Sequence, residues 1–556
     1  MQVLEHTLVF QCTRVAAIDT RALDIELSCF RKMANASWTH KVISFNRTGG
    51  PMRTAINLFV VCGLLLFVSS CTYVPFDTPK ESSRAISAEG TRAGRLVSDL
   101  TGHDSQILAM APLFDGNDAL GARLRMIETA ESSIDLQTFL IKPDLAGSLM
   151  WLALYSAAER GVKIRLLFDD VFTTAGDDQI ATLNAHPNVE IRVFNPLSRN
   201  STVAVNFLLD FSRVNRRMHN KVTITDGSFA ILGGRNIADE YFSIGTQYDF
   251  ADFDLFVAGK PVQTLSKSFD TYWNDAWSLP FDAIDDGDIV PLSEAYKQFQ
   301  NRALEQEVAI YDRALGSEYI RQLRNGEVPV YYGRVKIVAD DLQKLRTPSG
   351  TGPFAVGDAF YNSLGRAENS VIVVTPYFIP EEYGAEYLER LVKKGIDVSI
   401  VTNSLASTNH PYTHGHYARY RKRLLRAGAN FAEVRASAPP STEGVETPLT
   451  LHTKIALIDE TYVFVGSANV DPRSIRQNSE IGMLVRSPSL AKQIKTQLDA
   501  AVPIYTYSVS LNDAGKLQWE DTTTKNNPPL SPEPSAGFWR KLVAKVSSWL
   551  PIEQQL

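Results

Sequence analysis

Two copies of one short pattern constrain this chain more than any other feature of its sequence. Each copy has a histidine, a lysine two residues later, an aspartate five residues after that lysine, and an asparagine ten residues after the aspartate. The copies are His219, Lys221, Asp226 and Asn236, and then His452, Lys454, Asp459 and Asn469. One such match is weak evidence, whereas two with identical spacing predict a chain built from two related halves.

Shorter similarities in step with the two copies support a duplication. Ala130–Ile134 resembles Ala367–Val371, and Arg160–Ile164 resembles Lys394–Val398, each pair at nearly the separation of the motifs. Apolar stretches of strand length, such as Ser133–Ile141, alternate with stretches of helical periodicity. This alternation predicts an α/β fold in which a sheet is covered by helices, repeated once along the chain.

Each motif is typical of a strand, a turn and a second strand. Asp226-Gly227 is a pair that favours a hairpin turn. Side chains two residues apart on a strand share a face, so His219 and Lys221 are expected to point the same way. The apolar Val222 falls on the opposite face, where it is expected to pack into the core. The second motif repeats this arrangement.

The residue types of the motifs suit the cleavage of a phosphodiester. This reaction needs a nucleophile, a proton donor for the leaving alkoxide, and positive charge beside the phosphate oxygens. The imidazoles of His219 and His452 suit the first two roles because their ordinary pKa is about 6.5. The two lysines and the two asparagines can bind the phosphate oxygens. The scheme requires no metal and no other cofactor, and none is predicted.

Together with their flanks, the motifs resemble the phospholipase D superfamily, and the pattern is most similar to bacterial cardiolipin synthases of the lipoprotein-like C type. The resemblance covers residues 106–510 and the short C-terminal stretch 550–553. The flanking segments that carry it are Asp210–His219, Gly233–Phe242, Ser268–Asn274, Asp471–Ser474, Asn478 and Glu480. The resemblance implies two phospholipase-D-type α/β/α sandwich domains related by internal duplication, with one shared active site.

The resemblance also implies roles for individual residues. It assigns His219 as the nucleophile of a covalent phosphatidyl-histidine intermediate and His452 as the group that protonates the leaving alcohol. An acidic residue downstream of each motif is expected to orient the opposite histidine. Glu480 is the candidate for His219, and either Asp252 or Asp254 is the candidate for His452.

Other positions were assigned less directly. Asp226 and Asp459 belong to the motifs, and their places at the turns favour holding the hairpins and lysines over taking protons. The first half departs from the family pattern at Thr138–Ile141, where relatives tend to have Tyr-Tyr-Ile, whereas the second half keeps Thr375–Pro380. The departure concerns the substrate pocket and leaves the chemistry intact.

The function implied by the resemblance is a phosphatidyltransferase acting on phospholipid substrates, with cardiolipin as the favoured product. The alternative is a hydrolytic phospholipase D, in which water is the acceptor. A nuclease is less favoured, because the formal net charge is −6 and nucleic-acid binding requires a basic surface. Two intact motifs argue against a binding protein with an inactive site. The oligomeric state is left open.

The N-terminal part is expected to contain a targeting signal. The apolar run Leu58–Val68 is too short to span a bilayer, and Met52-Arg53 before it together with small residues after it are typical of a secretory signal peptide. Its end, Val68–Cys71, resembles a lipobox, with lipid attached at Cys71. A short membrane-anchor helix is the alternative. Residues 1–51 are interpreted as a start assigned too far upstream, and 52–70 as the signal peptide.

These features predict a location and a division of the chain. The protein is expected in a bacterial cell envelope, anchored at Cys71 and facing the periplasm, with the outer membrane favoured over the inner because Thr72 follows the cysteine. The remaining segments predicted are a tether over 71–105, a first domain over 106–290, a linker over 291–335, a second domain over 336–512, and a C-terminal linker with an amphipathic helix over 513–556.

The C-terminal segment has two interpretations. Phe538, Trp539 and further apolar residues up to Leu550 recur at helical spacing, with Arg540, Lys541 and Lys545 on the other side. Such a helix either lies in a membrane interface or docks on the body of the protein.

Two further groups of residues each have two interpretations. A zinc site built on His410, His414 and His416 has no fourth ligand nearby in the sequence, so a pocket wall is favoured. The basic residues from Arg419 to Arg426, and those from Arg213 to Arg217 before the first motif, are expected to form a solvated face or to attract anionic headgroups.

Overall fold

The computed structural model describes residues 73–102, 104–173, 177–244, 249–285, 289, 314–438, 448–523 and 528–556. The chain divides into two units, Met1–Ser70 and Cys71–Leu556, and all described elements belong to the second unit. The predicted signal peptide and Cys71 lie outside the described residues. Within the part that is described, no helix is both long and apolar enough to cross a bilayer.

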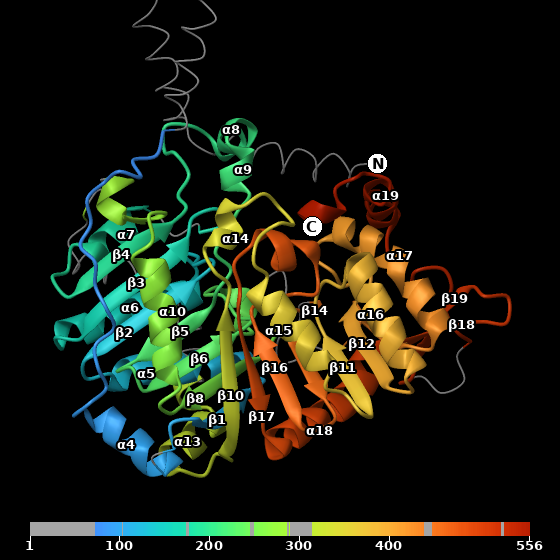
Figure 1. Cartoon of the computed structure of the whole chain (residues 1–556), viewed down its shortest axis with the longest axis horizontal. Coiled ribbons are helices and arrows are strands. Elements are labelled where there is room, and N and C mark those ends of the chain that lie inside the picture. Colours follow the sequence, from blue (N-terminus) through green and yellow to red (C-terminus); the bar gives the residue numbers. More distant parts are fainter. Residues whose placement is uncertain are drawn as a thin grey trace, which may run out of the picture. The chain divides into compact units, whose positions relative to one another are not determined.

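One continuous sheet of 17 strands runs through the second unit (Figure 1). Hydrogen-bonded neighbours give the order β9-β4-β3-β2-β5-β6-β8-β1-β10-β17-β16-β15-β11-β12-β13-β18-β19. The first-half strands are β1 (Ile107–Leu113), β2 (Ser133–Thr138), β3 (Lys163–Asp169), β4 (Val189–Phe194), β5 (Val222–Thr225), β6 (Phe229–Gly233), β8 (Asp254–Ala258) and β9 (Ser278–Pro280). The second-half strands are β10 (Tyr331–Ala339), β11 (Ser370–Val374), β12 (Asp397–Asn403), β13 (Asn430–Val434), β15 (Ile455–Ile458), β16 (Tyr462–Gly466), β17 (Ile481–Arg486), β18 (Thr506–Leu511) and β19 (Leu517–Asp521).

The strand pairing repeats once along the chain. In the first half, β2, β3 and β4 are parallel and the β5–β6 hairpin adds antiparallel to β2. In the second half, β11, β12 and β13 are parallel and the β15–β16 hairpin adds antiparallel to β11. An antiparallel pair between β1 and β10 joins the two half-sheets. A separate parallel pair, β7 (Asp249–Ala251) with β14 (Leu449–Leu451), bridges the halves beside the second motif.

Helices cover both faces of each half-sheet, so strand residues such as Thr223 and Thr225 are buried along with their apolar neighbours. In the first half, α5 and α6 bury one apolar face and α10 the other; in the second half, α15 to α17 bury one face and α18 the other. The core beneath α10 and α18 is shared by the two halves. The helices are α4 (Arg92–Thr101), α5 (Gly116–Thr129), α6 (Leu145–Glu159), α7 (Asp177–Asn184), α8 (Val203–Leu209), α9 (Phe211–Val214), α10 (Val262–Trp273), α13 (Glu318–Asn325), α14 (Gln343–Arg346), α15 (Ala355–Leu364), α16 (Glu381–Lys393), α17 (Pro411–Ala427), α18 (Pro488–Tyr505) and α19 (Phe538–Ser547).

Local sequence signals explain where several of these helices begin. The side chain of Asp115 accepts hydrogen bonds from the amides of Asn117 and Asp118 at the start of α5, and Asp144 accepts one from Gly147 in the first turn of α6. Carboxylates in this position satisfy amides that have no partner within the helix. The α/β fold with an internal repeat, predicted from the sequence, is confirmed: three parallel strands with an antiparallel hairpin beside them occur once in each half.

Some details differ from the sequence-based expectations. The segment 71–105, predicted as a tether, includes α4, which packs on β1 with Val97 buried. The boundary predicted between residues 335 and 336 falls inside β10, because that strand connects the two half-sheets. About half of the predicted linker, residues 291–313, lies outside the described residues.

Candidate active site

The two motif histidines stand just before the hairpins, not within them. Strand β5 begins at Val222 and β15 at Ile455, so each histidine and lysine belongs to the segment that enters the hairpin. This corrects the expectation that His219 and Lys221 lie on the strand itself. The reason is that these segments pair across the halves: the amide of His219 donates to the carbonyl of Ser479, and that of His452 donates to Ala251.

Residues at the ends of the neighbouring parallel strands hold the two entering segments. Asp169, the last residue of β3, accepts hydrogen bonds from the amide of Met218 and from the guanidinium of Arg217, both at 3.0 Å. Asn403, the last residue of β12, exchanges two hydrogen bonds of 2.9 Å with the backbone of Leu451. Each histidine is therefore preceded by a residue fixed to its own half-sheet.

Each histidine faces a carboxylate from the opposite half of the chain. Nδ1 of His219 lies 3.0 Å from both carboxylate oxygens of Glu480, and Nδ1 of His452 lies 2.6 Å from Oδ2 of Asp252. Glu480 and Asp252 are completely or almost completely buried, at 0% and 3% exposure. Because each carboxylate comes from the opposite half, the two motifs lie close together. Each lysine therefore acts electrostatically on the histidine of the other half.

Of the two aspartates that the sequence offered as partners of His452, only one contacts it. Asp252 contacts His452, whereas Asp254 forms buried ion pairs with Arg123 and Arg235. The close approach of Asp252 also explains a glycine of the motif flank, because a Cβ at Gly234 would stand 2.1 Å from Oδ1 of Asp252. Asp254 therefore belongs to the framework around β8.

The lysines and asparagines of the motifs surround the histidines. Lys221 Nζ donates to the carbonyl of His219 at 2.9 Å, and Lys454 Nζ donates to the carbonyl of His452. Asn236 Nδ2 donates to the hydroxyl of Tyr241 at 2.7 Å. The side-chain oxygens of Asn236 and Asn469 are buried and lack a hydrogen-bond partner among the described residues.

The motif aspartates lie at the far ends of the hairpins. Asp226 accepts hydrogen bonds from the amides of Glu131, Ser132 and Ser133, and Asp459 makes the same three bonds to the residues leading into β11. Both aspartates adopt left-handed backbone angles, with φ of 50° and 51°. They fasten each hairpin to the start of its neighbouring strand, and all three bonds of each carboxylate go to the backbone.

Aromatic side chains line the two histidines, and sequence reasoning did not assign them a role. Phe139 lies edge-on to His219 with ring centroids 4.8 Å apart, and Phe139 also faces Lys221 and Phe172. Tyr241 and Phe250 flank His452, each with its centroid 5.1 Å away. Phe139 falls in the stretch that departs from the family pattern, which is the one signal that pointed to this wall.

Burial governs the protonation of the site. It lowers the pKa of His219 to about 4 and that of His452 to about 3, although the facing carboxylates oppose both shifts. Burial likewise lowers the pKa of Lys221 to about 7 and of Lys454 to about 8. For Glu480 and Asp252, burial alone would raise the pKa, but the adjacent histidines and lysines hold it below the ordinary value.

Comparison with known proteins places this geometry in a family. A family model described as "Cardiolipin synthase, PLD-like domain" matches residues 124–273 and 360–502, more than half of the chain. The chain belongs to the phospholipase D superfamily. Within it, cardiolipin synthase C of Escherichia coli (strain K12) is 34% identical over 457 residues, covering 80% of this chain and 95% of that protein.

Two further comparisons agree with this assignment. An uncharacterized protein of Helicobacter pylori (strain ATCC 700392 / 26695) is 32% identical over 514 residues, covering 89% of this chain and 99% of its own length. The crystal structure of phosphatidylserine synthase from Haemophilus influenzae Rd KW20 aligns with 84% of this chain and 100% of its own, at a TM-score of 0.53 and 13% identity. The structural likeness supports the fold. The predicted membership of the phospholipase D superfamily and the predicted similarity to cardiolipin synthase C are confirmed.

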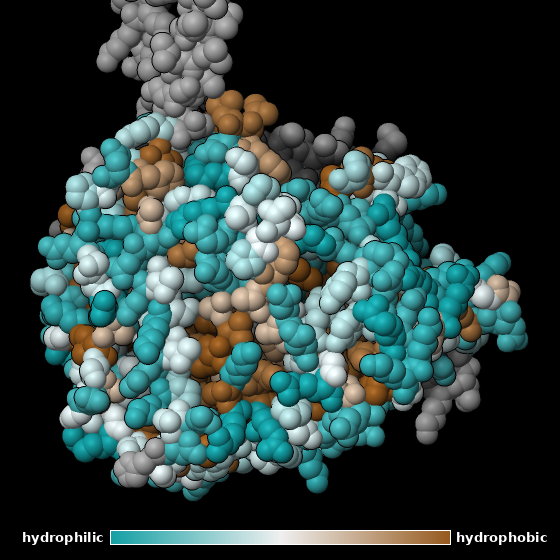
Figure 2. All heavy atoms as spheres, viewed as in Figure 1, coloured by the Kyte–Doolittle hydropathy of each residue, from teal (hydrophilic) through white to brown (hydrophobic). Residues whose placement is uncertain are grey.

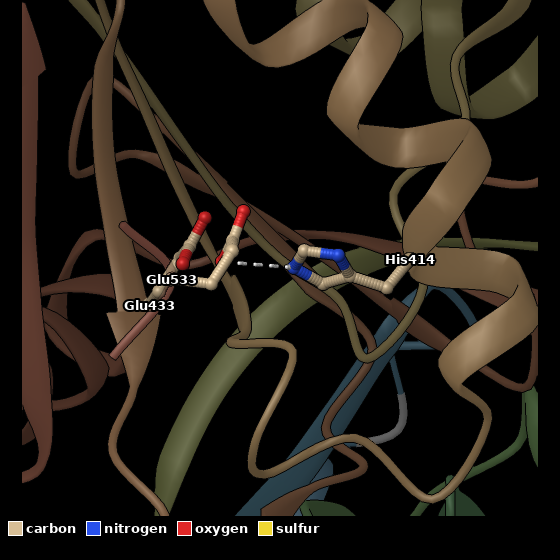
Figure 3. Close-up of side chains that lie close together, drawn as sticks. All are labelled: His414, Glu433 and Glu533. Carbon is tan, nitrogen blue, oxygen red and sulfur yellow. Dashed lines mark ion pairs between the residues drawn. The ribbon is translucent and has the colours of Figure 1, made fainter. Parts of the chain in front are cut away.

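The three histidines weighed as a zinc site in this phospholipase-D-type enzyme point to different places. His410 contacts Tyr412, and His416 contacts Glu553 and the carbonyl of Ser547. His414 instead faces Glu433 and Glu533, the one group among the described residues whose ligand atoms lie close enough for a metal ion (Figure 3).

That group is organised around a guanidinium. Arg421 donates to Glu433 at 2.6 Å and to Glu533 at 2.5 Å, and Glu433 also accepts from Tyr417 and Trp519. All of the carboxylate oxygens of Glu433 are thus engaged by protein donors. The network ties the segment before α19 to α17 and β13.

The basic residues that were expected to form a solvated face are mostly engaged within the protein. Arg419 pairs with Glu553, and Arg423 pairs with Glu382 and Glu389. Before the first motif, Arg213 pairs with Asp210 and Arg217 with Asp169. Of these, Arg213 and Arg217 anchor the segment that precedes His219.

Proposed function

We propose that this protein is a cardiolipin synthase that transfers a phosphatidyl group through a phosphatidyl-histidine intermediate. The observation that carries the proposal is the crossed pairing of His219 with Glu480 and of His452 with Asp252. A carboxylate on Nδ1 fixes the tautomer of an imidazole and directs its Nε2 toward a substrate. Two imidazoles so oriented provide a nucleophile and a general acid.

In the first step, Nε2 of His219 attacks the phosphorus of the donor phospholipid. A phosphorus–nitrogen bond forms and the bond from phosphorus to the headgroup oxygen breaks. His452, in its protonated form, gives its proton to the departing alkoxide, which leaves as an alcohol. Glu480 stabilises the positive charge that develops on His219 as the bond forms.

In the second step, the hydroxyl of the acceptor loses its proton to the now neutral His452. The oxygen of the acceptor hydroxyl attacks phosphorus, the phosphorus–nitrogen bond breaks, and His219 returns to its starting state. Because cardiolipin carries two phosphatidyl groups on one glycerol, the acceptor for this product is the free glycerol hydroxyl of a phosphatidylglycerol. The donor lipid is left open.

The remaining motif residues are suited to the phosphate oxygens. Lys221 and Lys454 supply positive charge at the histidines. The amide groups of Asn236 and Asn469 supply neutral donors once they are turned toward the substrate. For Asn236 this turn preserves its bond to Tyr241, because a tyrosine hydroxyl can donate as well as accept.

The protonation of the free enzyme fits this scheme when the substrate charge is included. With the pKa of both histidines lowered by burial, the site without substrate holds two neutral imidazoles at pH 7. A phosphodiester brings a negative charge, which raises the pKa of the histidines beside it. Asp252, 2.6 Å from Nδ1, then stabilises His452 in its imidazolium form.

Expression in a cardiolipin-null bacterium followed by lipid mass spectrometry tests the proposal. Appearance of cardiolipin, lost in a His219→Ala variant, supports the synthase. Accumulation of phosphatidic acid without cardiolipin would mean that water is the acceptor and that the protein is a hydrolytic phospholipase D. A chain that changes neither lipid would overturn both.

We also propose that the enzyme works at the periplasmic surface of a bacterial membrane, anchored by lipid on Cys71, with the outer membrane favoured. The apolar run Leu58–Val68 has the length of a signal peptide and not of a membrane span. A multiply acylated cysteine would keep the enzyme at the bilayer that contains its substrates, since a single chain anchors only weakly.

A further inference from the structure

Helix α19 is oriented with its small residues inward and its large apolar residues outward. Ala544 and Ser547 are buried against α17, whereas Phe538 and Trp539 of the helix are 71% and 68% exposed, and Trp549 just after it is 70% exposed. Leu542, Val543, Val546 and Leu550 are exposed as well. A helix that merely docked on the body would bury its large apolar side chains, because their burial is the main gain from docking.

Polar contacts and close backbone approach attach α19 to the body. Ser547 Oγ donates to the carbonyl of Tyr412, and Arg540 donates to the carbonyls of Leu405 and Thr408. At Gly415 of α17, an added Cβ would stand 2.0 Å from the carbonyl of Ala544. The outward apolar face is therefore fixed by specific contacts on the inward side.

A second exposed apolar group lies on α8 and α9. Leu208 is 80% exposed, and Val203, Leu209 and Phe211 are also exposed. Figure 1 places α8, α9 and α19 along one edge of the second unit, and Figure 2 shows hydrophobic side chains at that edge. The exposed side chains of α8–α9 and of residues 538–550 are called here the apolar rim.

Short connections link the apolar rim to the active-site residues. Helix α9 ends at Val214, five residues before His219. The C-terminal tail after α19 bridges the two groups: Asn215 donates to Gln555, and Arg473, four residues after Asn469, donates to the carbonyl of Gln555. Phe172, which is exposed, contacts Phe139 and so connects the surface to His219.

The charge of the segment that contains α19 indicates what kind of surface the segment can bind. From Pro534 to Ile552 the chain has three basic residues and no acidic residue. Lys545 lies on the exposed face, with its ammonium 5.7 Å from the ring of Trp549. Tryptophan and phenylalanine beside lysine suit the boundary between acyl chains and anionic headgroups.

We propose that the apolar rim is a membrane-docking surface that seats the active-site entrance on an anionic bilayer. Phe538, Trp539 and Trp549 enter the acyl boundary, Lys541 and Lys545 meet the headgroups, and α8 makes the second point of contact. The reason for such a surface rests on the proposed lipid substrate, but docking can be measured without turnover.

A site-specific probe tests docking in the full chain. The four cysteines are replaced by serine, which also removes any acylation at Cys71, and a single cysteine is introduced as Trp539→Cys or, as the control, Leu96→Cys. Leu96 is a half-exposed leucine on α4, far from the rim in Figure 1. Each is labelled with a polarity-sensitive fluorophore. On vesicles of equimolar phosphatidylcholine and phosphatidylglycerol, the label at 539 should shift to the blue and the label at 96 should not. Equal shifts, or no shift at 539, would overturn the proposal.

Variants then measure the contribution of the rim. Combined Phe538→Ser, Trp539→Ser and Trp549→Ser should lower partitioning into these vesicles at least about tenfold, and Leu96→Ser with Leu100→Ser should leave it unchanged. Lys541→Gln with Lys545→Gln should weaken binding to the phosphatidylglycerol mixture and not to pure phosphatidylcholine. Circular dichroism and thermal melting confirm that each variant is folded.

Two outcomes separate docking from its rivals. If the triple variant changes a dimer to a monomer in light scattering while vesicle binding is unaffected, the rim is an interface between copies and the proposal is wrong. Turnover of a short-chain lipid dissolved below its micelle concentration reports the active site alone. If the protein does not turn over the short-chain lipid but still docks on vesicles, the proposed function is contradicted and the docking surface is not.

Discussion

The carboxylate of Glu480 lies 3.0 Å from Nδ1 of His219, although the two residues belong to opposite halves of the chain. Glu480 is completely buried and is held by Ser467 Oγ and by the backbone contact of its amide with Asp340. The orientation of the nucleophile proposed for the first half therefore depends on the packing of the second half. The pair of His452 with Asp252 makes the dependence mutual.

Both histidines are expected to be necessary. Replacing either His219 or His452 by alanine should lower turnover about 10⁴-fold or more, because neither step can proceed with one imidazole. Rapid quenching with radiolabelled donor lipid should trap a protein-bound phosphatidyl group in the parent chain and none in His219→Ala. Near-normal activity of either single variant would contradict a shared site.

The crossed carboxylates are expected to act through the histidines. Glu480→Gln and Asp252→Asn should each lower kcat by about 10²–10⁴-fold with little change in KM, because the amide no longer stabilises the imidazolium. Asp254→Asn is the control, since Asp254 pairs with arginines. That variant should have a clearly lower melting temperature but a kcat close to that of the parent. A larger loss of kcat in Asp254→Asn than in Asp252→Asn would mean that the acids are misassigned.

The buried lysines should set the alkaline limit of activity. Because burial lowers the pKa of Lys221 to about 7 and of Lys454 to about 8, kcat/KM should fall as the pH rises through this range and both lose their positive charge. An arginine stays protonated, so Lys221→Arg should reduce the maximum but shift the alkaline fall to higher pH. A variant that loses activity at the same pH as the parent would exclude Lys221 as the titrating group.

Activity should persist in EDTA. In the proposed mechanism the positive charge beside the phosphate comes from Lys221 and Lys454, and both proton transfers use histidine. Turnover should therefore be equal in metal-free buffer with chelator and in buffer supplemented with magnesium, calcium or zinc. Loss on chelation that one divalent metal restores would show that the scheme lacks a component.

Lipid attachment at Cys71 can be read from mass. Intact-mass analysis of protein extracted from membranes should give a chain that begins at Cys71 and carries acyl groups. A Cys71→Ser variant should lose those groups and be released more readily by washing. A variant that is equally retained and unshifted in mass would rule out the lipoprotein proposal and leave the catalytic one untouched.

The sequence predicted the site better than its surroundings. The motif spacing identified the histidines, and the family pattern pointed to Glu480, because both are written in short segments. The choice between Asp252 and Asp254 depended on Arg123, a residue far away in the chain that pairs with Asp254. The contact of Phe139 with His219 depended on how β2 ends beside the hairpin. No local pattern contains such information.

Helix α19 shows the same limit in another form. Its helical spacing was evident, but periodicity states only that two faces differ, not which one meets the body. The inward face was decided by Gly415 and by hydrogen bonds to carbonyls of α17 and the loop before it. The expectation that Lys545 lies opposite the apolar residues was wrong for this reason, because it shares their exposed side.

Each half of this chain contributes one motif histidine and one carboxylate, and the carboxylate pairs with the histidine of the other half. Two identical copies of either half, paired about a two-fold axis, would therefore hold two complete histidine–acid couples, but both couples would be the same. Joining the halves in one polypeptide removes that identity. Glutamate can serve one imidazole and aspartate the other, with Phe139 beside the first and Tyr241 and Phe250 beside the second. In the proposed reaction one histidine attacks phosphorus and the other donates a proton, so different surroundings for the two histidines are an advantage. In a symmetric dimer the two histidines would become different only after the substrate had bound.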